Sequence, residues 1–309
     1  MTDTRYIIIS PVRNEARYLP KTIASVASQT IRPHLWVIVD DGSSDETRRF
    51  VDEAAWYHHW VRAIHRPDRG CRRAGSGVME AFYDGYKIVE RESWDFLVKL
   101  DGDLSFEPEF FEQCFAAFRT DPSLGIGGGL VCTKTNGKIV AEFKDPVFHV
   151  RGPAKIYRRE CWLQIGGLIR MAGWDTFDQV KANMLGWKTR TFDDIKVIHH
   201  RVTGGAYGAW SNYVKNGLAN YIVGYHPLFM FLKCGRRFFR KPYGLAAVAL
   251  MAGFLRGYLK RIPQAEDRAV IAYIRDQQLA YLFGRKSIWG ARFGNREQPP
   301  EIRKASRFQ

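Results

Sequence analysis

The stretch Phe96-Leu-Val-Lys-Leu-Asp-Gly-Asp103 is a short apolar run that ends in two aspartates around a glycine. A second apolar run, residues 35–39, ends in the same way at Asp40 and Asp41. Asp and Gly are common in turns, so turn formation explains one such cluster. Neither turn formation nor core packing explains why two apolar runs should each be followed directly by a pair of aspartates. The repetition therefore indicates a ligand site.

Strand-like and helix-like segments alternate around these two runs. Short β-branched runs predict strands, and apolar residues three or four positions apart predict helices. The alternation is typical of an α/β fold with a parallel sheet, whose ligands bind beyond the carboxyl ends of the strands. The predicted strands are 6–10 (ended by Pro11), 35–39, 61–65 and 96–100, and the predicted helices are 19–28, 45–55 and 75–89.

The regular alternation stops after Asp103. The pair Asn136-Gly137 lies between two strand patterns and predicts a hairpin. No internal repeat is present, so the first 200 residues read as one α/β domain. The further predicted elements are helices 108–118 and 176–185 and strands 125–132, 138–143 and 188–199.

Charge divides the 309 residues into two unequal parts. Residues 1–200 contain 28 Lys and Arg against 27 Asp and Glu, whereas residues 201–309 contain 19 against 5. A near-neutral body therefore carries a strongly basic final third. A protein that binds nucleic acid over its whole surface would be basic throughout, and this chain is not. The positive charge therefore has to be explained by a role of the final third alone.

Cysteine spacing and the N-terminus indicate the compartment. The five cysteines form no C-x-x-C pair, which argues against a cysteine zinc site and a disulfide framework. The apolar run Tyr6-Ile-Ile-Ile9 is too short for a signal-peptide core, and no uncharged run reaches the length of an ordinary membrane span. We therefore expect a cytoplasmic protein.

Four motifs together carry a family resemblance. They are Ser10-Pro-Val-Arg-Asn-Glu15, Val39-Asp-Asp-Gly-Ser-Ser-Asp45, Asp101-Gly-Asp103, and Gly173-Trp-Asp175 ahead of Gly186. In this order and spacing the chain resembles a family-2 glycosyltransferase over roughly residues 5–200. The resemblance implies a GT-A fold, which is an α/β, Rossmann-like fold with a mostly parallel central sheet. It also implies an inverting enzyme with a nucleotide-sugar-binding half at about 1–105 and an acceptor half at about 106–205.

The resemblance implies a divalent metal at the Asp101-Gly-Asp103 triplet. The diphosphate of a nucleotide-sugar leaves with negative charge, and hard oxygen ligands suit Mn²⁺ or Mg²⁺. Asp103 is the expected direct ligand, and Asp101 is expected to contact the ribose or a metal-bound water. His199 and His200, at the end of the last predicted strand, are both candidates for a further metal ligand. The sequence does not favour one over the other.

The same resemblance places the nucleoside beside Asp40 and Asp41, with Pro11 and Glu15 lining its pocket. A carboxylate accepts the ring N–H of uracil, which favours a UDP-sugar, although guanine and thymine also present an N–H. Arg13 is a candidate neighbour of this pocket, or else a surface arginine.

A basic loop, residues 65–73, precedes the helix predicted at 75–89. A helix N-terminus with nearby cations suits phosphate. Arg72 or Arg73 is therefore a candidate contact of the diphosphate or of an anionic acceptor, and a solvated loop is the alternative.

The catalytic base is assigned by counting back from Gly186. In the family an Asp eleven residues before such a glycine takes the acceptor proton, which places the base at Asp175. The preceding residue is Trp174 where the family commonly has Glu; it is a candidate to stack on a sugar, or to pack. Asp178 lies one helical turn further on and is the reserve for the same role.

The final third, residues 206–309, is predicted to be helical, with apolar blocks followed by basic ones. This arrangement suits helices that lie on an anionic leaflet, although packing of the helices against the catalytic domain is the alternative. We expect a peripheral enzyme at the cytoplasmic face of the membrane, with a lipid-linked or cell-surface saccharide as acceptor.

Two other functions are weighed against this one. A sugar-phosphate nucleotidyltransferase has a related fold, but its glycine-rich N-terminal loop is missing here. A nucleic-acid-binding protein would use the basic third and would leave the acidic clusters unexplained. The leading interpretation therefore includes a nucleotide-sugar partner and no nucleic acid.

Overall fold

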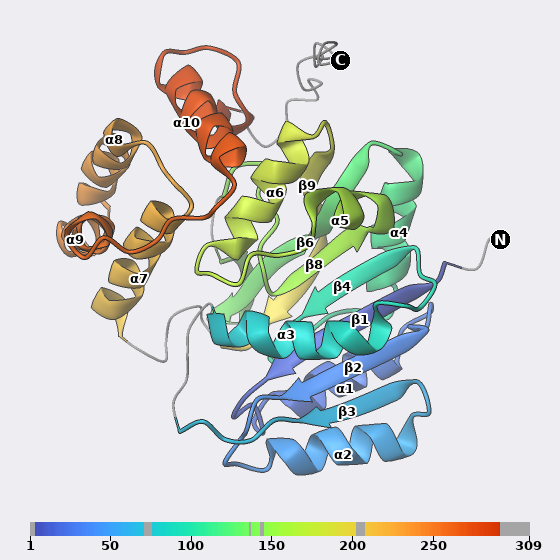
Figure 1. Ribbon diagram of the computed structural model, residues 1–309. Helices are drawn as coiled ribbons and strands as arrows, with labels where there is room; N and C mark the ends of the chain where they lie inside the picture. Colours follow the sequence, from blue (N-terminus) through green and yellow to red (C-terminus); the bar gives the residue numbers. More distant parts are fainter. Residues whose placement is uncertain are drawn as a thin grey trace.

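A central sheet of mixed direction organises the chain (Figure 1). The computed structural model describes residues 4–70, 76–135, 137–142, 145–201, 208–240 and 242–290. Within these residues the sheet has nine strands in the order β3-β2-β1-β4-β8-β6-β9-β5, and β7 pairs with β6 alone. The strands are β1 (Tyr6–Val12), β2 (Leu35–Asp40), β3 (Val61–His65), β4 (Phe96–Leu100), β5 (Leu104–Ser105), β6 (Leu124–Thr135), β7 (Lys138–Ala141), β8 (Ala154–Arg158) and β9 (Lys188–His199).

Helices lie on both faces of the sheet and at one end of it. They are α1 (Leu19–Ala27), α2 (Thr47–Tyr57), α3 (Ser76–Val89), α4 (Phe110–Thr120), α5 (Arg159–Ile165), α6 (Trp174–Met184), α7 (Ala209–Ile222), α8 (Pro227–Phe238), α9 (Leu245–Leu259), α10 (Arg268–Leu282) and the short 3₁₀ helix η2 (Ile288–Gly290).

The strand directions confirm the prediction of a mostly parallel sheet. Strands β3, β2, β1 and β4 pair in parallel, and β6 and β9 run the same way. Strand β8, which the sequence pattern did not reveal, is antiparallel to both β4 and β6. The predicted end of the first strand at Pro11 is wrong, because β1 continues to Val12. Pairing with β4 stops at Ile9, so Pro11 lies where only β2 remains as a partner.

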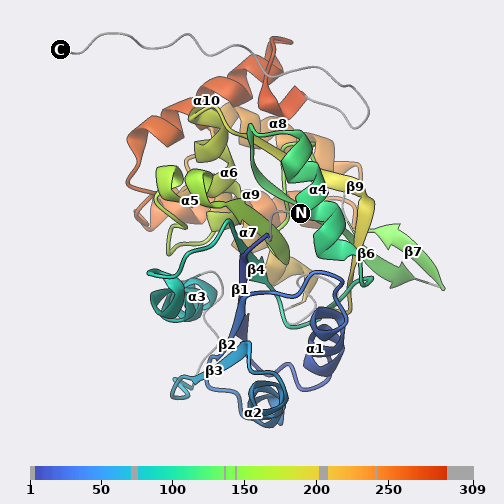
Figure 2. The ribbon, with the colours of Figure 1, turned by 90° about the vertical axis from the view of Figure 1, so that its right-hand side faces the viewer.

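Each face of the sheet has its own hydrophobic core. One core joins the sheet to α1, α2 and α4 and is rich in phenylalanine from α4. The other joins it to α3, α5 and α6. Figure 2 shows the sheet from its edge, with α1 and α4 on one side and α3 and α5 on the other. The double covering explains why the strands of the parallel block are almost continuously apolar.

The C-terminal helices form a third core that includes part of the catalytic domain. Phe177 and Val180 of α6 pack in the same cluster as Tyr221, Phe229 and residues of α9 and α10. The apolar block 221–232 is not one helix, because Gly224 has a positive φ and α8 starts anew at Pro227. The domain boundary expected at residue 205 falls outside the described residues and stays a prediction.

Helices α7 and α9 cross at very short range through two glycines. A Cβ on Gly217 would lie 1.9 Å from the carbonyl oxygen of Leu250, and one on Gly253 would lie 1.9 Å from that of Val214. Each glycine thus faces backbone of the opposite helix. No side chain, not even a methyl group, fits between these two helices without separating them.

We predict that Gly253→Ala lowers the free energy of unfolding by about 1–3 kcal/mol, because the new methyl overpacks the crossing. Urea unfolding measures the change. Gly235→Ala on α8 is the matched control, since nothing lies within 4 Å of the added Cβ. It should leave stability unchanged or raise it by up to about 1 kcal/mol through helix propensity. Equal effects of the two changes would contradict the close crossing.

Candidate active site

The carboxyl ends of β1, β2 and β4 meet at one edge of the sheet. Val12 is paired with Asp40, and the backbone N–H of Asp41 donates to the carbonyl of Val12 (2.8 Å). The two acidic clusters predicted from the sequence therefore follow neighbouring strands on either side of β1. Beyond Val12 the chain turns at Asn14, whose φ is positive and whose backbone N–H donates to Ser43 Oγ (2.9 Å).

Asp103 and His199 come together although 96 positions separate them in the chain. The short strand β5 pairs with the end of β9 and places Leu104 opposite His199. His199 Nε2 lies 3.3 Å from Asp103 Oδ2, and His199 Nδ1 lies 3.1 Å from Glu142 Oε2. Burial alone lowers the pKa of His199, but the two carboxylates raise it to about 9. The imidazole is thus held between two acidic groups.

The Asp103 carboxylate has the character of a cation ligand. Its side chain is nearly buried, and its Oδ1 atom has no hydrogen-bond partner among the residues that the structure describes. An unpartnered buried carboxylate oxygen is costly unless a cation or a donor satisfies it. No group of three or more His, Cys, Asp or Glu side chains in the described part of the chain is arranged to hold a metal. Asp103 and His199 would therefore need water or substrate oxygens as additional ligands.

His200, the other candidate histidine, turns away from Asp103. Its Nε2 lies 2.9 Å from Ser105 Oγ, and its ring stacks on Tyr18 at 5.9 Å. Only its backbone N–H contacts Asp103, at the carbonyl oxygen (2.9 Å). Burial lowers the pKa of His200. Of the two, His199 is the one whose ring faces the triplet.

Arg201 joins this end of β9 to the first loop. Its guanidinium forms an ion pair with Glu15, and its Nε lies 3.8 Å from Asp103 Oδ2. The backbone N–H of Glu15 donates to Thr47 Oγ1 (2.7 Å). Glu15 is buried and therefore anchors the loop on both sides.

Asp40 and Asp41 are both buried, and both already have partners. Asp40 accepts from the backbone N–H of Ser43 (2.9 Å) and lies 3.1 Å from His65 Nδ1. Asp41 forms ion pairs with Arg66 and Arg69. Burial raises the pKa of Asp41, and the arginines oppose this shift. The two carboxylates thus hold the loops that surround them.

Arg13 is part of the same network. It donates to the carbonyl oxygen of Asp41 and to Asp68 Oδ1 (2.7 Å). A Cβ on Gly42 would lie 2.5 Å from the Cα of Asp68, so the two loops are in backbone contact. Arg72 and Arg73 lie outside the described residues.

Two buried lysines lie beneath Asp101 and Trp174. Lys99 pairs with Asp101 and donates to the carbonyl of Gly152 (3.0 Å). The Trp174 ring has Lys99 Nζ at 5.3 Å and Lys155 Nζ at 5.5 Å from its centre. Burial raises the pKa of Asp101, and Lys99 opposes this shift. Trp174 is nearly buried and packs over the two ammonium groups.

Asp178 is fully engaged in the core. Lys155 Nζ donates to both of its carboxylate oxygens (3.0 and 2.9 Å), and the Tyr157 hydroxyl donates to Oδ2 (2.6 Å). Burial raises the pKa of Asp178 and lowers that of Lys155, and their mutual attraction opposes both shifts. These contacts describe a structural ion pair between β8 and α6.

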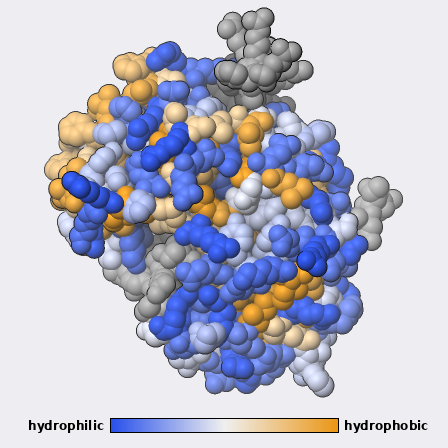
Figure 3. All heavy atoms as spheres, viewed as in Figure 1, coloured by the Kyte–Doolittle hydropathy of each residue, from blue (hydrophilic) through white to orange (hydrophobic). Residues whose placement is uncertain are grey.

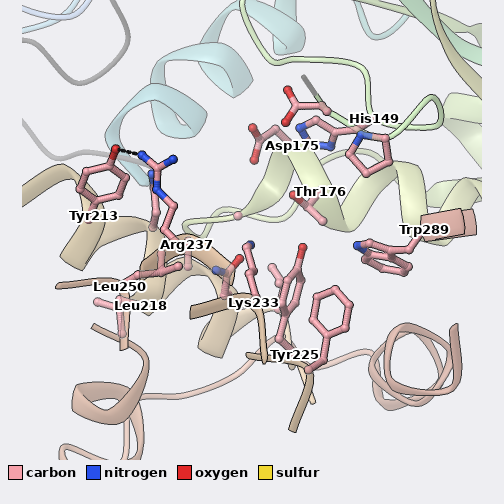
Figure 4. A pocket seen from close by; sticks show the side chains of 18 of the residues that line it. His149, Asp175, Thr176, Tyr213, Leu218, Tyr225, Lys233, Arg237, Leu250 and Trp289 are labelled. Atoms are coloured by element: carbon pink, nitrogen blue, oxygen red, sulfur yellow. Dashed lines mark hydrogen bonds between the residues drawn. The ribbon is translucent and has the colours of Figure 1, made fainter. Parts of the chain in front are cut away.

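Asp175 differs from Asp178 because its carboxylate reaches a cavity. Its carbonyl oxygen accepts from Lys155 Nζ (2.8 Å), whereas its carboxylate has no hydrogen bond within the residues that the structure describes. The cavity has a volume of about 1450 Å³ and lies between α6 and the C-terminal helices. Figure 4 shows Asp175 and His149 on the same side of it. Burial lowers the pKa of His149, and Asp145 and Asp175 oppose this shift.

Several residues that hold the site together were not predicted from the sequence. Glu142, Lys99 and His149 lie outside the acidic motifs, and the partner of Glu142, His199, is remote in the chain. A lysine inside an apolar strand, as at Lys99, was an available signal, because a buried lysine requires a partner. Glu142 and His149 carried no such signal.

The chain was compared with protein-family models and with curated proteins. The model of Glycosyl transferase family 2 matches residues 7–171, which is more than half of the chain. The chain is 32% identical over 117 residues to chondroitin synthase of Escherichia coli, covering 38% of this chain and 16% of that protein. It is 30% identical over 128 residues to polyprenol monophosphomannose synthase of Mycolicibacterium smegmatis, covering 41% of this chain and 46% of that protein. The matched stretch thus spans less than half of either relative.

Solved structures share the fold. The mannosyltransferase PcManGT from Pyrobaculum calidifontis, in complex with GDP-Man and Mn²⁺, superimposes with a TM-score of 0.51 at 19% identity. The alignment covers 92% of this chain and 76% of that chain. S. aureus TarS 1–349, in complex with UDP-GlcNAc, gives a TM-score of 0.51 at 16% identity, with 90% and 81% covered.

We predict that Lys155→Met lowers the free energy of unfolding by about 3–5 kcal/mol, because it leaves the buried Asp178 carboxylate without its cation. Chemical denaturation measures the loss. Lys188→Met is the matched control, since it removes a partly exposed ion pair with Asp121 and should cost less than about 1 kcal/mol. A Lys155→Met protein as stable as the control would contradict the structural role of this pair.

Proposed function

Because the chain belongs to glycosyl transferase family 2, we propose that this nucleotide-sugar glycosyltransferase is an inverting, metal-assisted enzyme that acts on a lipid-linked or cell-surface saccharide. One observation carries the proposal. The Asp101-Gly-Asp103 triplet, which His199 contacts, is held by Lys99, and the Lys99 ammonium group lies 5.3 Å from the ring of Trp174, the residue directly before Asp175 on the border of the cavity. A donor site and an acceptor site would thus adjoin each other.

We assign the donor nucleoside to the loops that follow β1 and β2. Pro11, Asp40 and Asp41 line the carboxyl ends of these strands, and Arg13 links both loops through Asp41 and Asp68. Since the Asp40 carboxylate is held by Ser43 and His65, recognition of a uracil N–H would require it to share these partners. A UDP-sugar remains our first candidate. The solved structures with the same fold hold GDP-Man and UDP-GlcNAc. A binding experiment should therefore include sugars of both uridine and guanosine diphosphate.

A divalent cation fits the chemistry of Asp103, and His199 would join it as a ligand once the cation displaces the proton that Asp103 and Glu142 favour on its ring. The orphaned Oδ1 of Asp103 offers a hard oxygen ligand, and Glu142 on His199 Nδ1 orients the ring. Few protein ligands are expected when substrate phosphates complete the shell of Mg²⁺ or Mn²⁺. When bound, such an ion neutralises the charge that develops on the leaving diphosphate. Asp101, held by Lys99, is placed beside this site to contact the ribose or a water ligand.

Asp175 is our candidate for the general base. In the transfer the acceptor hydroxyl oxygen forms a bond to the anomeric carbon, while the bond from that carbon to the diphosphate breaks. The hydroxyl proton passes to the Asp175 carboxylate, and the nucleoside diphosphate leaves with the electron pair. Lys155, bound to the Asp175 carbonyl, fixes the start of α6 and so positions this carboxylate. Asp178 accepts hydrogen bonds from Lys155 and Tyr157 and is therefore a weaker candidate for the general base.

Neither alternative function has an observation in its favour. The family match includes both acidic clusters, which a nucleic-acid-binding protein would not need. The first strand runs into Ser10-Pro11 without the glycine-rich loop of a nucleotidyltransferase. We therefore retain transfer of a sugar as the single proposed reaction.

The exposed apolar side chains of the C-terminal helices support attachment to an anionic membrane. In Figure 3 they gather at the upper left, over α8 and α9, among hydrophilic residues. None of the described helices is both long and apolar enough to cross a membrane. Peripheral binding would combine the apolar contacts with attraction of the basic residues to acidic lipids. The most exposed members of this surface, the α8–α9 patch, are Phe231, Phe239, Tyr243, Val248 and Leu259.

We predict that Asp175→Asn and Asp103→Asn have separable effects. Asp175→Asn should keep donor binding and lower the rate of transfer by about 10²–10⁴-fold, because only the proton acceptor is lost. Asp103→Asn should abolish the dependence of donor binding on Mn²⁺. Calorimetric titration of UDP-, GDP- and dTDP-sugars, with and without Mn²⁺, measures binding, and release of nucleoside diphosphate measures turnover. Asp194→Asn, on an exposed part of β9, is the control. Undiminished transfer in Asp175→Asn would refute this base.

We predict that the double change Phe239→Glu and Leu259→Glu releases the protein from vesicles that contain anionic lipid. Both side chains are largely exposed, so the fold should tolerate them. Cosedimentation with phosphatidylglycerol-containing vesicles measures the effect at low and high salt. Trp56→Glu, equally exposed on α2, is the control and should sediment like the original protein. If the double change instead dissociates a dimer in size-exclusion chromatography, the α8–α9 patch serves self-association.

A further inference from the structure

The cavity beside Asp175 has walls of opposite charge. One wall comes from the catalytic domain and includes Asp145, His149 and Asp175. The other comes from the C-terminal helices. Figure 4 shows Lys233 and Tyr225 directed from that second wall toward Asp175 and Thr176. The five basic residues of the second wall are Lys215, Lys233, Arg236, Arg237 and Arg240.

Three of these cations have no carboxylate partner in the part of the chain that the structure describes. Lys233 Nζ lies 5.1 Å from the centre of the Tyr225 ring, and Arg236 donates to the Tyr281 hydroxyl (3.2 Å). Arg240 lines the cavity as well and forms no ion pair with any residue that the structure describes. Tight clustering of like charges is unfavourable unless an anion lies among them. This wall therefore presents a site for a negatively charged group.

The two walls face each other across one cavity, and Figure 4 shows Lys233 and Tyr225 directed from one wall toward Asp175 and Thr176 on the other. Burial raises the pKa of Tyr225, and the charges of Asp175 and Asp145 add to this shift. A single ligand can thus reach both walls. The ligand can be larger than one sugar ring, because the cavity volume of about 1450 Å³ exceeds that of an ordinary small-molecule pocket.

We propose that the acceptor carries a phosphate group, which Lys233, Arg236 and Arg240 bind while the accepting hydroxyl lies at Asp175. This inference rests on the proposed function and names the chemical class of the acceptor. Aromatic side chains complete the second wall: Phe229 and Trp289 lie 6.0 Å apart, and Trp289 also packs on Tyr225. They provide an apolar face for a sugar ring or the first part of a lipid chain.

Calorimetric titration of the full chain with two matched pairs of probes tests the proposal. Geranyl phosphate is compared with geraniol, and glucose 6-phosphate with glucose. In at least one pair the phosphate should bind about tenfold or more tightly than the neutral partner, as charge-assisted hydrogen bonds predict. The pair that shows the preference identifies the phosphate as part of a lipid or of a saccharide.

Lys233→Met should abolish this preference, and Lys233→Arg should keep it. Arg256→Met is the matched control, because Arg256 is an exposed cation of α9 that does not line the cavity. Arg240→Met provides a second test of the same wall if Lys233→Met is unstable. Equal binding of phosphate and neutral probes, or equal losses in Lys233→Met and Arg256→Met, would overturn the proposal.

Donor binding is measured in the same preparations and should be unchanged by Lys233→Met. A protein that binds a nucleotide-sugar but shows no phosphate preference refutes the acceptor class alone. A protein that binds no nucleotide-sugar refutes the proposed function, whatever the cavity binds.

Discussion

The buried ammonium group of Lys155 is the contact on which the arrangement of the site depends. It pairs with Asp178 and also binds the carbonyl oxygen of Asp175, so one side chain of β8 fixes the first turn of α6. Burying both charges is costly, and the cost is offset only because hydrogen bonds satisfy them. Trp174 packs over the same ammonium group and over Lys99, which in turn holds Asp101. A continuous chain of contacts therefore connects the Asp101-Gly-Asp103 triplet to Asp175.

The strand order determines which groups meet at the edge of the sheet. Because β1 lies between β2 and β4, the loops after all three converge, and Val12 pairs with Asp40. The far half of the sheet contributes through β9, whose last residue, His199, reaches Asp103. Glu142 and Arg201 then complete the surroundings of that pair. The metal chemistry that we propose thus draws on residues from both halves of the sheet.

The C-terminal helices line the cavity beside Asp175, and they carry the exposed apolar surface that we propose to bind a membrane. Their core includes residues of α6, so the C-terminal helices are packed against the helix that begins at Trp174, and their cations line the cavity beside it. The close crossing of α7 and α9 through Gly217 and Gly253 keeps this unit compact. The basic excess of the final third is consequently divided: some cations line the cavity, and others, such as Arg256, face outward.

The sequence by itself determined the fold class, the two acidic strand ends and the family, because alternating apolar runs and short motifs are local patterns. It also predicted Asp103 as the metal ligand and Asp175 as the base, with Asp178 as the second candidate, and it left the choice between His199 and His200 open. Only the tertiary structure decided that His199 faces Asp103, that Asp178 belongs to the core and that a cationic wall lies across from Asp175. The reason is that ion pairs and cavities depend on side chains that are remote in the chain, and no local pattern records which of them meet.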